Sequence, residues 1–542
     1  MCLIPAVPSP SRGPHVPTQT FPARGSRGRR PAARAGALLL TSWGEASSDA
    51  GASTTESGDP VAGGSLTVLQ TGEPRSLDPA ALTNYWAFQP ALGNALYGTL
   101  MVNDVESLDI EYKMATDFST TDGGATFALE LRPDLVFTDG TPLDAAAVKY
   151  NWDRLVDPAL GSTSGRWAAQ IAETRVEGPT TLQVTMRSPN PHYAQSIVGS
   201  SLNWIASPAA LAKGPGEFDA NPVGAGPFTL TSWTRQDAIE LTKNPDYWDA
   251  PKPYLDTLTI RTVSDTNQRV NAMTTGAADL ASETNWASLN KVEAAGLNTE
   301  VVPTGGGQFV GMNFARAPFD DARARRAVSL AVDLDAINTA VYNDEGQIPE
   351  TLFEESSQFF SDIPLKETDP AAAQKLFDEL AAEGKPVSFT FLSYPTTESR
   401  TLGEALQAQL SAFQNVEAKV DVVDYAQATA RTAARDFDML ISSAVIQDPD
   451  NPLWLAFHKD SSGNTVGVDD AELNAALDAG RIGVTVEERT AAYETVQERL
   501  VELNPGIWYY RAVPAVVWGE NVQGVDVYAL GSPLPEEIWV TD

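Results

Sequence analysis

Cysteine and histidine are scarce in this chain of 542 residues. The single cysteine is Cys2, and the three histidines, His15, His192 and His458, lie far apart in the sequence. One cysteine excludes a disulfide framework within the chain and any cluster of thiolate metal ligands. No G-x-S-x-G, H-E-x-x-H, P-loop or G-x-G-x-x-G pattern accompanies the histidines. We therefore interpret them as surface or packed residues, and we expect no metal site, no cofactor and no catalytic residue.

Basic residues are also few, with 37 Lys and Arg against 71 Asp and Glu, a formal charge of -34. Residues 61–542 alone hold 31 basic and 67 acidic side chains, a net charge of -36. Such a surface is repelled by phosphate backbones and anionic lipid, so we expect no nucleic-acid partner. Long hydrophobic runs are missing as well, because no stretch approaches the roughly 18 apolar residues of a spanning helix. The protein is expected to be soluble or anchored.

Residues 1–60 are predicted to be an export signal followed by a disordered linker. The basic part holds Arg24, Arg27, Arg29, Arg30 and Arg34. The apolar stretch after it, residues 35–40, is shorter than the roughly 7 to 15 residues of a secretory signal. Residues 44–64 are rich in Ser, Gly, Ala, Thr and Asp, a composition typical of flexible linkers.

A possible lipid-attachment motif lies within that segment. Residues 40–42 (Leu-Thr-Ser) resemble the first three positions of a bacterial lipobox, whose fourth residue is the lipidated cysteine, but Trp43 occupies that place. Two interpretations stay open for residues 1–60: an export signal whose anchor has been lost, or a disordered stretch with a mis-stated start.

The body of the chain predicts more than one lobe. A single hydrophobic core stops growing at roughly 250 to 300 residues. The first half is strand-rich: period-two alternation or short apolar runs predict strands at 65–70, 125–132, 176–186 (a hairpin), 228–233, 238–243 and 257–263. A turn at Asp139-Gly140 leads into a helix for which Asp144 is a plausible N-cap.

The pattern changes after about Gly305 to alternating helices and strands. Helices are predicted after Asp321, Asp333 and Asp369, and strands at 387–394, 416–423 and 437–442. A capping box at 485–488 opens a further helix that Pro505 closes. Short connections between alternating strands and helices indicate an α/β lobe.

Five stretches in this order resemble the extracytoplasmic solute-binding proteins of family 5, the peptide, opine and nickel group that serves ABC importers. They are residues 76–79 (SLDP), residues 131–148 (LRPDLVFTDGTPLDAAAV), residues 221–228 with 244–248, residues 311–313 with 318–320 and 325–333, and residues 448–451 (DPDN). The resemblance covers essentially residues 62–542. We interpret most of these motif residues as scaffold, since they carry turn chemistry.

The resemblance implies an α/β fold of the class II periplasmic-binding-protein type, with two lobes, a hinge and an extra small domain inserted in the first lobe. The expected division is 61–97, 175–305 and 506–542 for lobe one, 98–174 for the small domain, and 306–505 for lobe two. The chain is then expected to cross between lobes near 305–307 and 504–506.

The same resemblance implies an extracytoplasmic protein that captures a solute between its lobes and delivers it to ABC permease subunits. It further implies a monomer without enzymatic activity, at the cell surface or in the periplasm, on the outer face of the cytoplasmic membrane. Two other classes stay open from the residues alone: a secreted hydrolase, and a surface adhesin or chaperone-like protein.

Candidate ligand contacts are residues on loops that should face the interlobe cleft, because pockets favour domain interfaces. They are Tyr85, Trp86, Trp286, Gln308, Asn313, Val445, Ile446, Gln447 and Trp454.

Val445 affects which solute is expected. By resemblance, peptide-binding members hold the ligand's α-ammonium with an aspartate at the position that Val445 occupies. An apolar side chain cannot pair a desolvated ammonium. The expected solute is therefore oligopeptide-like but uncharged at that end, or a neutral solute such as an oligosaccharide. Nickel is not favoured, because only two histidines remain in the body.

Overall fold

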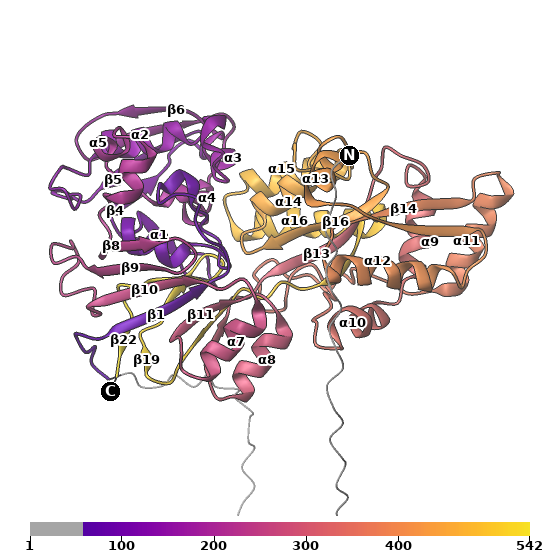
Figure 1. Ribbon diagram of the computed structural model, residues 1–542. Coiled ribbons are helices and arrows are strands. Elements are labelled where there is room, and N and C mark those ends of the chain that lie inside the picture. The colour runs from indigo at the N-terminus through magenta and orange to yellow at the C-terminus, as the bar shows by residue number, and fades with distance from the viewer. Residues whose placement is uncertain (1–57, 542) are drawn as a thin grey trace, which may run out of the picture. The chain divides into compact units, whose positions relative to one another are not determined.

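The structure is a computed structural model that describes residues 58–541 (Figure 1). Cys2, His15 and Trp43 lie outside the described residues, and so does the predicted export segment up to residue 57. Among the helices that the structure describes, none is both long and apolar enough to cross a membrane.

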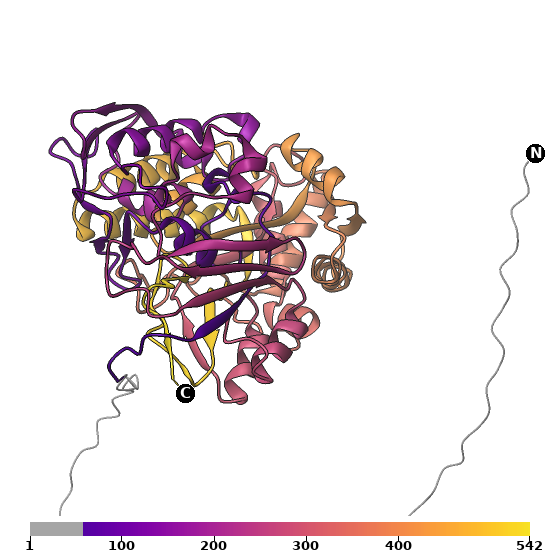
Figure 2. The ribbon, with the colours of Figure 1, turned by 60° about the vertical axis from the view of Figure 1, so that its left-hand side comes forward.

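The first large sheet has seven strands in the order β12-β18-β11-β1-β10-β9-β8. These strands are β1 (Ser65–Gln70), β8 (Phe228–Thr234), β9 (Ala238–Lys243), β10 (Thr257–Thr262), β11 (Leu280–Glu283), β12 (Asn298–Val301) and β18 (Ala515–Trp518). The central strand β1 runs parallel to both β10 and β11 and buries Leu66 and Val68 in the core. Four of the predicted strands are confirmed in this sheet, and Figure 2 shows its strands side by side.

Short helices cover this sheet. They are α1 (Pro90–Tyr97), α5 (Pro208–Leu211), α6 (Pro215–Ala220), α7 (Thr266–Thr274) and α8 (Trp286–Ala294), with the 3-10 turn η1 (Pro79–Ala81). Helices α7 and α8 bury Met273 and Val292 against Leu69 of β1. Two short ribbons complete this part of the chain: β19 (Val522–Gln523) with β22 (Trp539–Val540), and β20 (Val527–Tyr528) with β21 (Ser532–Pro533).

A four-stranded antiparallel sheet has a separate core. Its strands are β4 (Ala115–Ser119), β5 (Thr126–Leu131), β6 (Ile171–Val176) and β7 (Thr181–Met186). The accompanying elements are the ribbon β2 (Met101–Asn103) and β3 (Ile110–Tyr112), the helices α2 (Ala145–Arg154), α3 (Gly165–Ala168) and α4 (Tyr193–Val198), and the 3-10 turns η2 (Pro158–Leu160) and η3 (Ser201–Asn203). Asp144 caps α2 as predicted. The core around Phe127 and Trp152 runs from Leu100 to Ile205 and is completed by Ala80, Ala225, Tyr528, Ala529 and Leu534.

The predicted end of the small inserted domain, residue 174, falls inside β6. Strand β7 follows that boundary but pairs with β5 and β6 along its length. The division into lobes stays a prediction, and we propose that the inserted domain runs to about residue 205, because most residues of its core lie between Leu100 and Ile205.

The second large sheet has five strands in the order β15-β14-β16-β13-β17. They are β13 (Gly305–Met312), β14 (Val387–Ser393), β15 (Val416–Val422), β16 (Met439–Ile446) and β17 (Gly506–Tyr510). Its helices are α9 (Ala322–Ala331), α10 (Leu334–Tyr342), α11 (Pro370–Ala382), α12 (Thr397–Leu410), α13 (Tyr425–Ala433), α14 (Asp450–Phe457), α15 (Ala471–Ile482) and α16 (Val486–Leu503). The predicted helix starts after Asp333 and Asp369 and the capping box at Thr485 are confirmed, and both aspartates cap their helices.

The chain passes between the two large sheets twice. The first passage lies between β12 and β13, and the second lies between β17 and β18. Because β17 pairs with β13, the second passage comes after Tyr510, later than the predicted crossing near 504–506. The passages are joined by a hydrogen bond from Val302 N to Pro514 O of 2.9 Å. We propose residues 302–304 and 511–514 as the connections between the lobes.

Glycine is required where these passages begin. A Cβ atom on Gly307, which has φ +126°, would lie 2.2 Å from the carbonyl oxygen of Tyr510. Only glycine allows the two backbones to approach this closely.

Candidate binding site

A cavity of about 430 Å³ lies between segments that belong to the three cores. This volume is within the range of roughly 300 to 1,000 Å³ that small-molecule sites occupy. The lining comes from residues 83–85, 195–199 and 529–530, from residues 163–167 near α3, and from residues between 442 and 463 on β16 and α14. We call this space the interlobe cavity.

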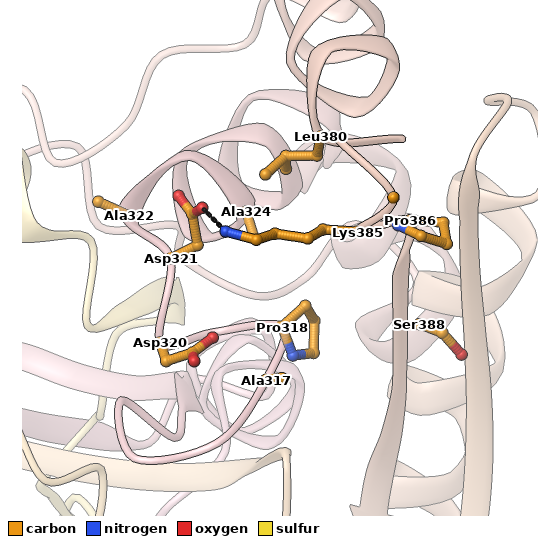
Figure 3. A pocket seen from close by; sticks show the side chains of 11 residues that line it. Ala317, Pro318, Asp320, Asp321, Ala322, Ala324, Leu380, Lys385, Pro386 and Ser388 are labelled. Atoms are coloured by element: carbon orange, nitrogen blue, oxygen red, sulfur yellow. Dashed lines mark ion pairs between the residues drawn. The ribbon is translucent and has the colours of Figure 1, made fainter. Parts of the chain in front are cut away.

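A larger groove of about 600 Å³ is confined to the second lobe (Figure 3). It lies between the start of α9 and the segment that joins α11 to β14. Asp321 caps α9 and pairs with Arg323 at 2.8 Å, and Lys385 Nζ lies 3.9 Å from the same carboxylate. Because its charged groups pair with one another and only one lobe contributes, we do not take this groove as the site.

Strand β16 contributes residues 442–445 to the lining of the interlobe cavity. Ser443 and Val445 are on one face of the strand and line the cavity. Ile446 is on the other face, where it is 1% exposed and packs in a cluster with Phe309 and Leu453. The two-residue period of a strand therefore separates Val445 from its neighbour Ile446.

Tyr85 supplies an aromatic wall. Its ring centroid lies 4.0 Å from that of Trp86. Burial raises the pKa of the Tyr85 hydroxyl well above its ordinary value, so the group is a neutral hydrogen-bonding side chain. Trp86 is buried next to Tyr85 and is fixed by a hydrogen bond, in which its Nε1 donates to the carbonyl oxygen of Glu283 at 3.2 Å.

Arg166 is the cationic side chain of the lining. Its guanidinium lies over the ring of Trp167, 4.4 Å from the centroid. Arg166 is exposed by its surface area, yet the protein packed around it lowers its pKa by desolvation, and no carboxylate among the described residues offsets that effect. The cavity therefore contains a positive charge without a protein counter-charge, which favours an anionic group of a ligand.

Asp448 is the acidic side chain of the lining, and it is already paired. Arg489 Nη2 lies 2.8 Å from Asp448 Oδ2, and the pair is almost fully buried. The other oxygen, Oδ1, accepts a hydrogen bond from the backbone N–H of Asp450 at 3.0 Å. Asp448 is consequently held by its own lobe and is not free to bind a ligand cation.

Polar side chains bridge the cavity wall from the second lobe to the first. Gln447 Nε2 donates to the carbonyl oxygen of Ala529 at 2.8 Å. Asn451 Nδ2 donates to Ser196 Oγ at 2.7 Å. These bonds show that the described conformation is closed, with the cavity enclosed on both sides.

Three of the nine predicted contact residues are brought together at this cavity. Tyr85, Val445 and Gln447 all line it, although they come from opposite lobes. Their contact with a solute stays a prediction.

The other six lie elsewhere and make internal contacts. Trp86 and Ile446 are buried behind the lining, as described above. Trp286 Nε1 donates to the carbonyl oxygen of Arg511 at 2.9 Å, next to the second chain passage. Gln308 Oε1 accepts from the hydroxyl of Tyr509.

Asn313 and Trp454 are also turned away from the cavity. Asn313 is fully buried, and its Nδ2 donates to the carbonyl oxygen of Phe437 at 2.8 Å. Trp454 stacks on His458 with centroids 4.5 Å apart and donates to Asp478 at 3.2 Å. Helix α14 thus presents Asn451 and Leu455 to the cavity and Trp454 to its own lobe.

Sequence reasoning missed Arg166 and Trp167, which contribute the charge and a second aromatic ring. They lie in the short helix α3 of the inserted domain. The adjacent arginine and tryptophan were a local signal for a binding surface. Nothing local indicates that this surface faces residues almost 300 positions later.

Two α/β lobes that close over a solute-sized cavity, with a small domain inserted in the first, define the class II periplasmic-binding-protein fold. Comparison with protein families gives the particular group. Residues 109–464 match the model of the bacterial extracellular solute-binding proteins, family 5 (middle region). The match covers more than half of the chain, so the protein belongs to this family.

Individual proteins of this kind are also similar to the chain. The glutathione-binding protein GsiB of Shigella flexneri is 28% identical over 354 residues, which cover 64% of this chain and 67% of GsiB. The structure of AgaA from A. tumefaciens R10, in complex with agropinic acid, matches with a TM-score of 0.72 and 24% identity, covering 88% of this chain and 99% of AgaA. DppA from Helicobacter pylori, in complex with the peptide STSA, matches with a TM-score of 0.73 and 21% identity, covering 89% and 98%.

Membership of this family gives the general role. The protein is the solute-binding subunit of an ABC importer, and its relatives are extracellular or periplasmic binding proteins for transport.

Proposed function

We propose that the protein captures an oligopeptide-like solute that carries a carboxylate or similar anionic group and has no free ammonium group at Val445. The observation that carries this proposal is Arg166, the lining cation for which the described residues provide no carboxylate. A solute anion placed there would gain a charge-assisted hydrogen bond in a partly desolvated site.

The part of the cavity wall around β16 lacks an unpaired acid among the described residues. Val445 and Ser443 are uncharged, and Asp448 is paired with Arg489. A ligand ammonium in this region would lose its hydration without gaining a counter-charge. The chemistry therefore favours a solute whose charge is concentrated at one end.

Known ligands of relatives support the carboxylate of the proposed solute, whereas the absence of an ammonium group rests on Val445 alone, because glutathione carries both groups. By their names and titles, GsiB binds glutathione, AgaA is in complex with agropinic acid, and DppA of H. pylori is in complex with a tetrapeptide. A neutral oligosaccharide could stack on Tyr85 and Trp167, but it would leave Arg166 without a counter-charge. The proposal further includes delivery to ABC permease subunits, a monomeric state, no catalysis, and a place at the outer face of the cytoplasmic membrane.

The first test identifies the solute. Native mass spectrometry of protein purified without denaturation is expected to show a co-purified small anion. Calorimetry then compares glutathione, N-acetylated tripeptides and their C-terminal amides on the unmodified protein and on Arg166→Gln. Arg187→Gln is the matched control, because Arg187 is an exposed arginine of the same domain that donates to the carbonyl oxygen of Ala169.

The expected result is that amidation of the carboxylate and Arg166→Gln each weaken binding by about tenfold or more, the size of a lost charge-assisted hydrogen bond. The Arg187→Gln control should bind normally. Equal affinity of the acid and the amide for the unmodified protein would contradict the proposed anionic solute.

A further inference from the structure

A second set of contacts joins the small inserted domain to the second lobe outside the interlobe cavity. Asn190 Nδ2 donates to Asp450 Oδ2 at 2.9 Å, and both side chains are buried. His192 Nε2 lies 2.6 Å from the carbonyl oxygen of Gly483. Burial lowers the pKa of His192, so the neutral ring donates its Nε2–H to that carbonyl. None of these four residues lines the cavity.

The Asp450 carboxylate is held in position for this hydrogen bond by residues of its own lobe. Arg481 Nε lies 2.7 Å from Asp450 Oδ1, and the Arg481 guanidinium lies over the ring of Trp454. Burial raises the pKa of Asp450, and Asp448 nearby adds to that effect. One oxygen is therefore satisfied within the lobe, while the other needs a donor when water is excluded. Among the described residues, Asn190 is the side chain that donates to it.

The Asn190 side chain is also held in position, by residues of the inserted domain. Its Oδ1 accepts the backbone N–H of His192 at 3.0 Å, and its own N–H donates to the carbonyl oxygen of Gly124 at 3.1 Å. Because Oδ1 is committed to this turn, the amide Nδ2 is directed to Asp450. Neither partner needs a solute to hold its orientation.

The free energy that the hydrogen bond between Asn190 and Asp450 contributes depends on whether the lobes are closed. When the lobes separate, water can solvate Asp450. When they close, the carboxylate is desolvated, and its Oδ2 atom would lack a hydrogen-bond donor, which would oppose closure even though Arg481 pairs with Oδ1. The Asn190 amide compensates for this desolvation cost, because a hydrogen bond to a charged group is among the stronger ones in proteins.

We propose that Asn190 and Asp450 form a latch that keeps part of the solute-free protein closed and thereby sets solute affinity without touching the solute. The proposal rests on the proposed function only in that closure is what captures the solute. The apparent dissociation constant is the intrinsic one divided by the closed, binding-competent fraction. A change in the latch should thus alter affinity for every solute by a similar factor.

The test measures the distance between the lobes in the solute-free protein. The full chain carries Cys2→Ser, which removes its only cysteine, together with Tyr150→Cys and Glu494→Cys on exposed faces of α2 and α16. Spin labels on these two positions report open and closed forms by double electron–electron resonance. The variants to compare are Asn190→Asp, Asn190→Ser, and Asn190→Asp combined with Asp450→Asn.

Each variant tests one part of the latch. Asn190→Asp retains the acceptor for His192 but places a second carboxylate against Asp450. Asn190→Ser also retains an acceptor but is too short to reach Asp450, so it should have a milder effect. The double variant exchanges donor and acceptor and should restore the contact. Gln183→Glu is the matched control, because it adds the same charge at a residue that accepts hydrogen bonds from Arg175 within its own sheet.

The solute-free unmodified protein should show a closed population, and Asn190→Asp should lower the ratio of closed to open forms by about tenfold. Asn190→Ser should lower the ratio less, the double variant should recover most of it, and Gln183→Glu should leave it unchanged. A thermal melt of each variant checks that it is folded.

Three outcomes would overturn the latch. They are a solute-free protein with only the open distance, a folded Asn190→Asp with the unmodified distance distribution, and a double variant as open as the single one. None of these readouts uses a solute. The latch can therefore fail while the anionic-solute proposal stands, and the reverse is also possible.

Discussion

Val445 shows how one side chain can exclude a class of ligands. It lines the interlobe cavity on the same face of β16 as Ser443, where by resemblance peptide-binding relatives have an aspartate. We expect Val445→Asp to strengthen binding of free-amine di- to pentapeptides by about tenfold, because it supplies the missing counter-charge. The gain should be only partial, since the surrounding loop does not orient an amine. Calorimetry with a peptide series measures it.

Val445→Thr is the control for that substitution, because it has nearly the same shape and no charge. It should leave peptide binding weak. If the unmodified protein already binds free-amine peptides tightly, and N-acetylation abolishes that binding, another carboxylate holds the amine and the role assigned to Val445 is wrong.

Glu536 makes stability depend on pH. It is 4% exposed, its Oε2 has no hydrogen-bond partner among the described residues, and burial raises its pKa to about 7 from an ordinary value of 4.5. A carboxyl group with a raised pKa favours the folded state while it is protonated. Its contribution is complete below about pH 4.5 and is lost as the pH rises through about 7.

We therefore expect Glu536→Gln to be more stable than the unmodified protein at pH 8.5, by about 2–3 kcal/mol, and similar to it near pH 4.5. Urea unfolding at several pH values measures this difference. Glu537→Gln is the control, because Glu537 pairs with Lys252 at 2.7 Å, and its removal should not increase stability at high pH. Parallel pH profiles for Glu536→Gln and the unmodified protein would contradict the assignment.

At the scale of one element, the capping box of α16 supports the site from a distance. Thr485 Oγ1 accepts the N–H of Glu488 at 3.2 Å, and Glu488 Oε2 accepts the N–H of Thr485 at 3.2 Å. The first turn of this helix carries Arg489, which holds Asp448. Loss of the cap should therefore loosen the part of the helix nearest the cavity.

We expect Thr485→Ala to lower the free energy of unfolding by about 1 kcal/mol, the usual cost of an N-cap. Thr495→Ala is the control within the same helix, because the Thr495 hydroxyl donates only to the carbonyl oxygen of Ala491. That change should be neutral or slightly stabilising, since alanine is the better helix former. Urea denaturation compares the two, and an equal loss for both would contradict a specific capping effect.

Local sequence patterns predict where helices and strands lie better than they predict which sheet a strand joins. The helix starts at Asp144, Asp333 and Asp369 are predictable because the preferences of the first helical positions involve only a few adjacent residues. In contrast, the resemblance assigned residues 506–542 to lobe one, whereas β17 (Gly506–Tyr510) pairs with β13 of the second sheet. Residues far away in the sequence decide which sheet a strand joins. The local pattern of the strand therefore does not predict its pairing partner.

The same distinction applies to the site. Tyr85, Val445 and Gln447 were reachable from motif order and from the preference of pockets for domain interfaces. Trp286 and Trp454 were selected as aromatics on loops, yet each donates its indole N–H to its surroundings. A sequence shows that an aromatic residue is present, but the direction of its ring depends on packing across the fold.

At the scale of the whole molecule, two short connections allow the lobes to move as units. Residues 302–304 and 511–514 run side by side and are joined by the bond from Val302 to Pro514. Arg511, at the start of the second connection, donates to the carbonyl oxygens of Gly306 in β13 and of Leu352 at 3.1 Å each. Such paired connections keep the axis of motion defined while a few backbone angles absorb the change.

We expect a saturating solute to draw the lobes together, because both lobes contact the solute only in the closed form. The radius of gyration from small-angle X-ray scattering should fall, and the curve should approach that calculated from residues 58–541 of the closed structure. The solute for this experiment is the one that calorimetry shows to bind most tightly. Arg166→Gln at the same concentration is the control and should stay more open. Identical curves with and without that solute would contradict closure about these two connections.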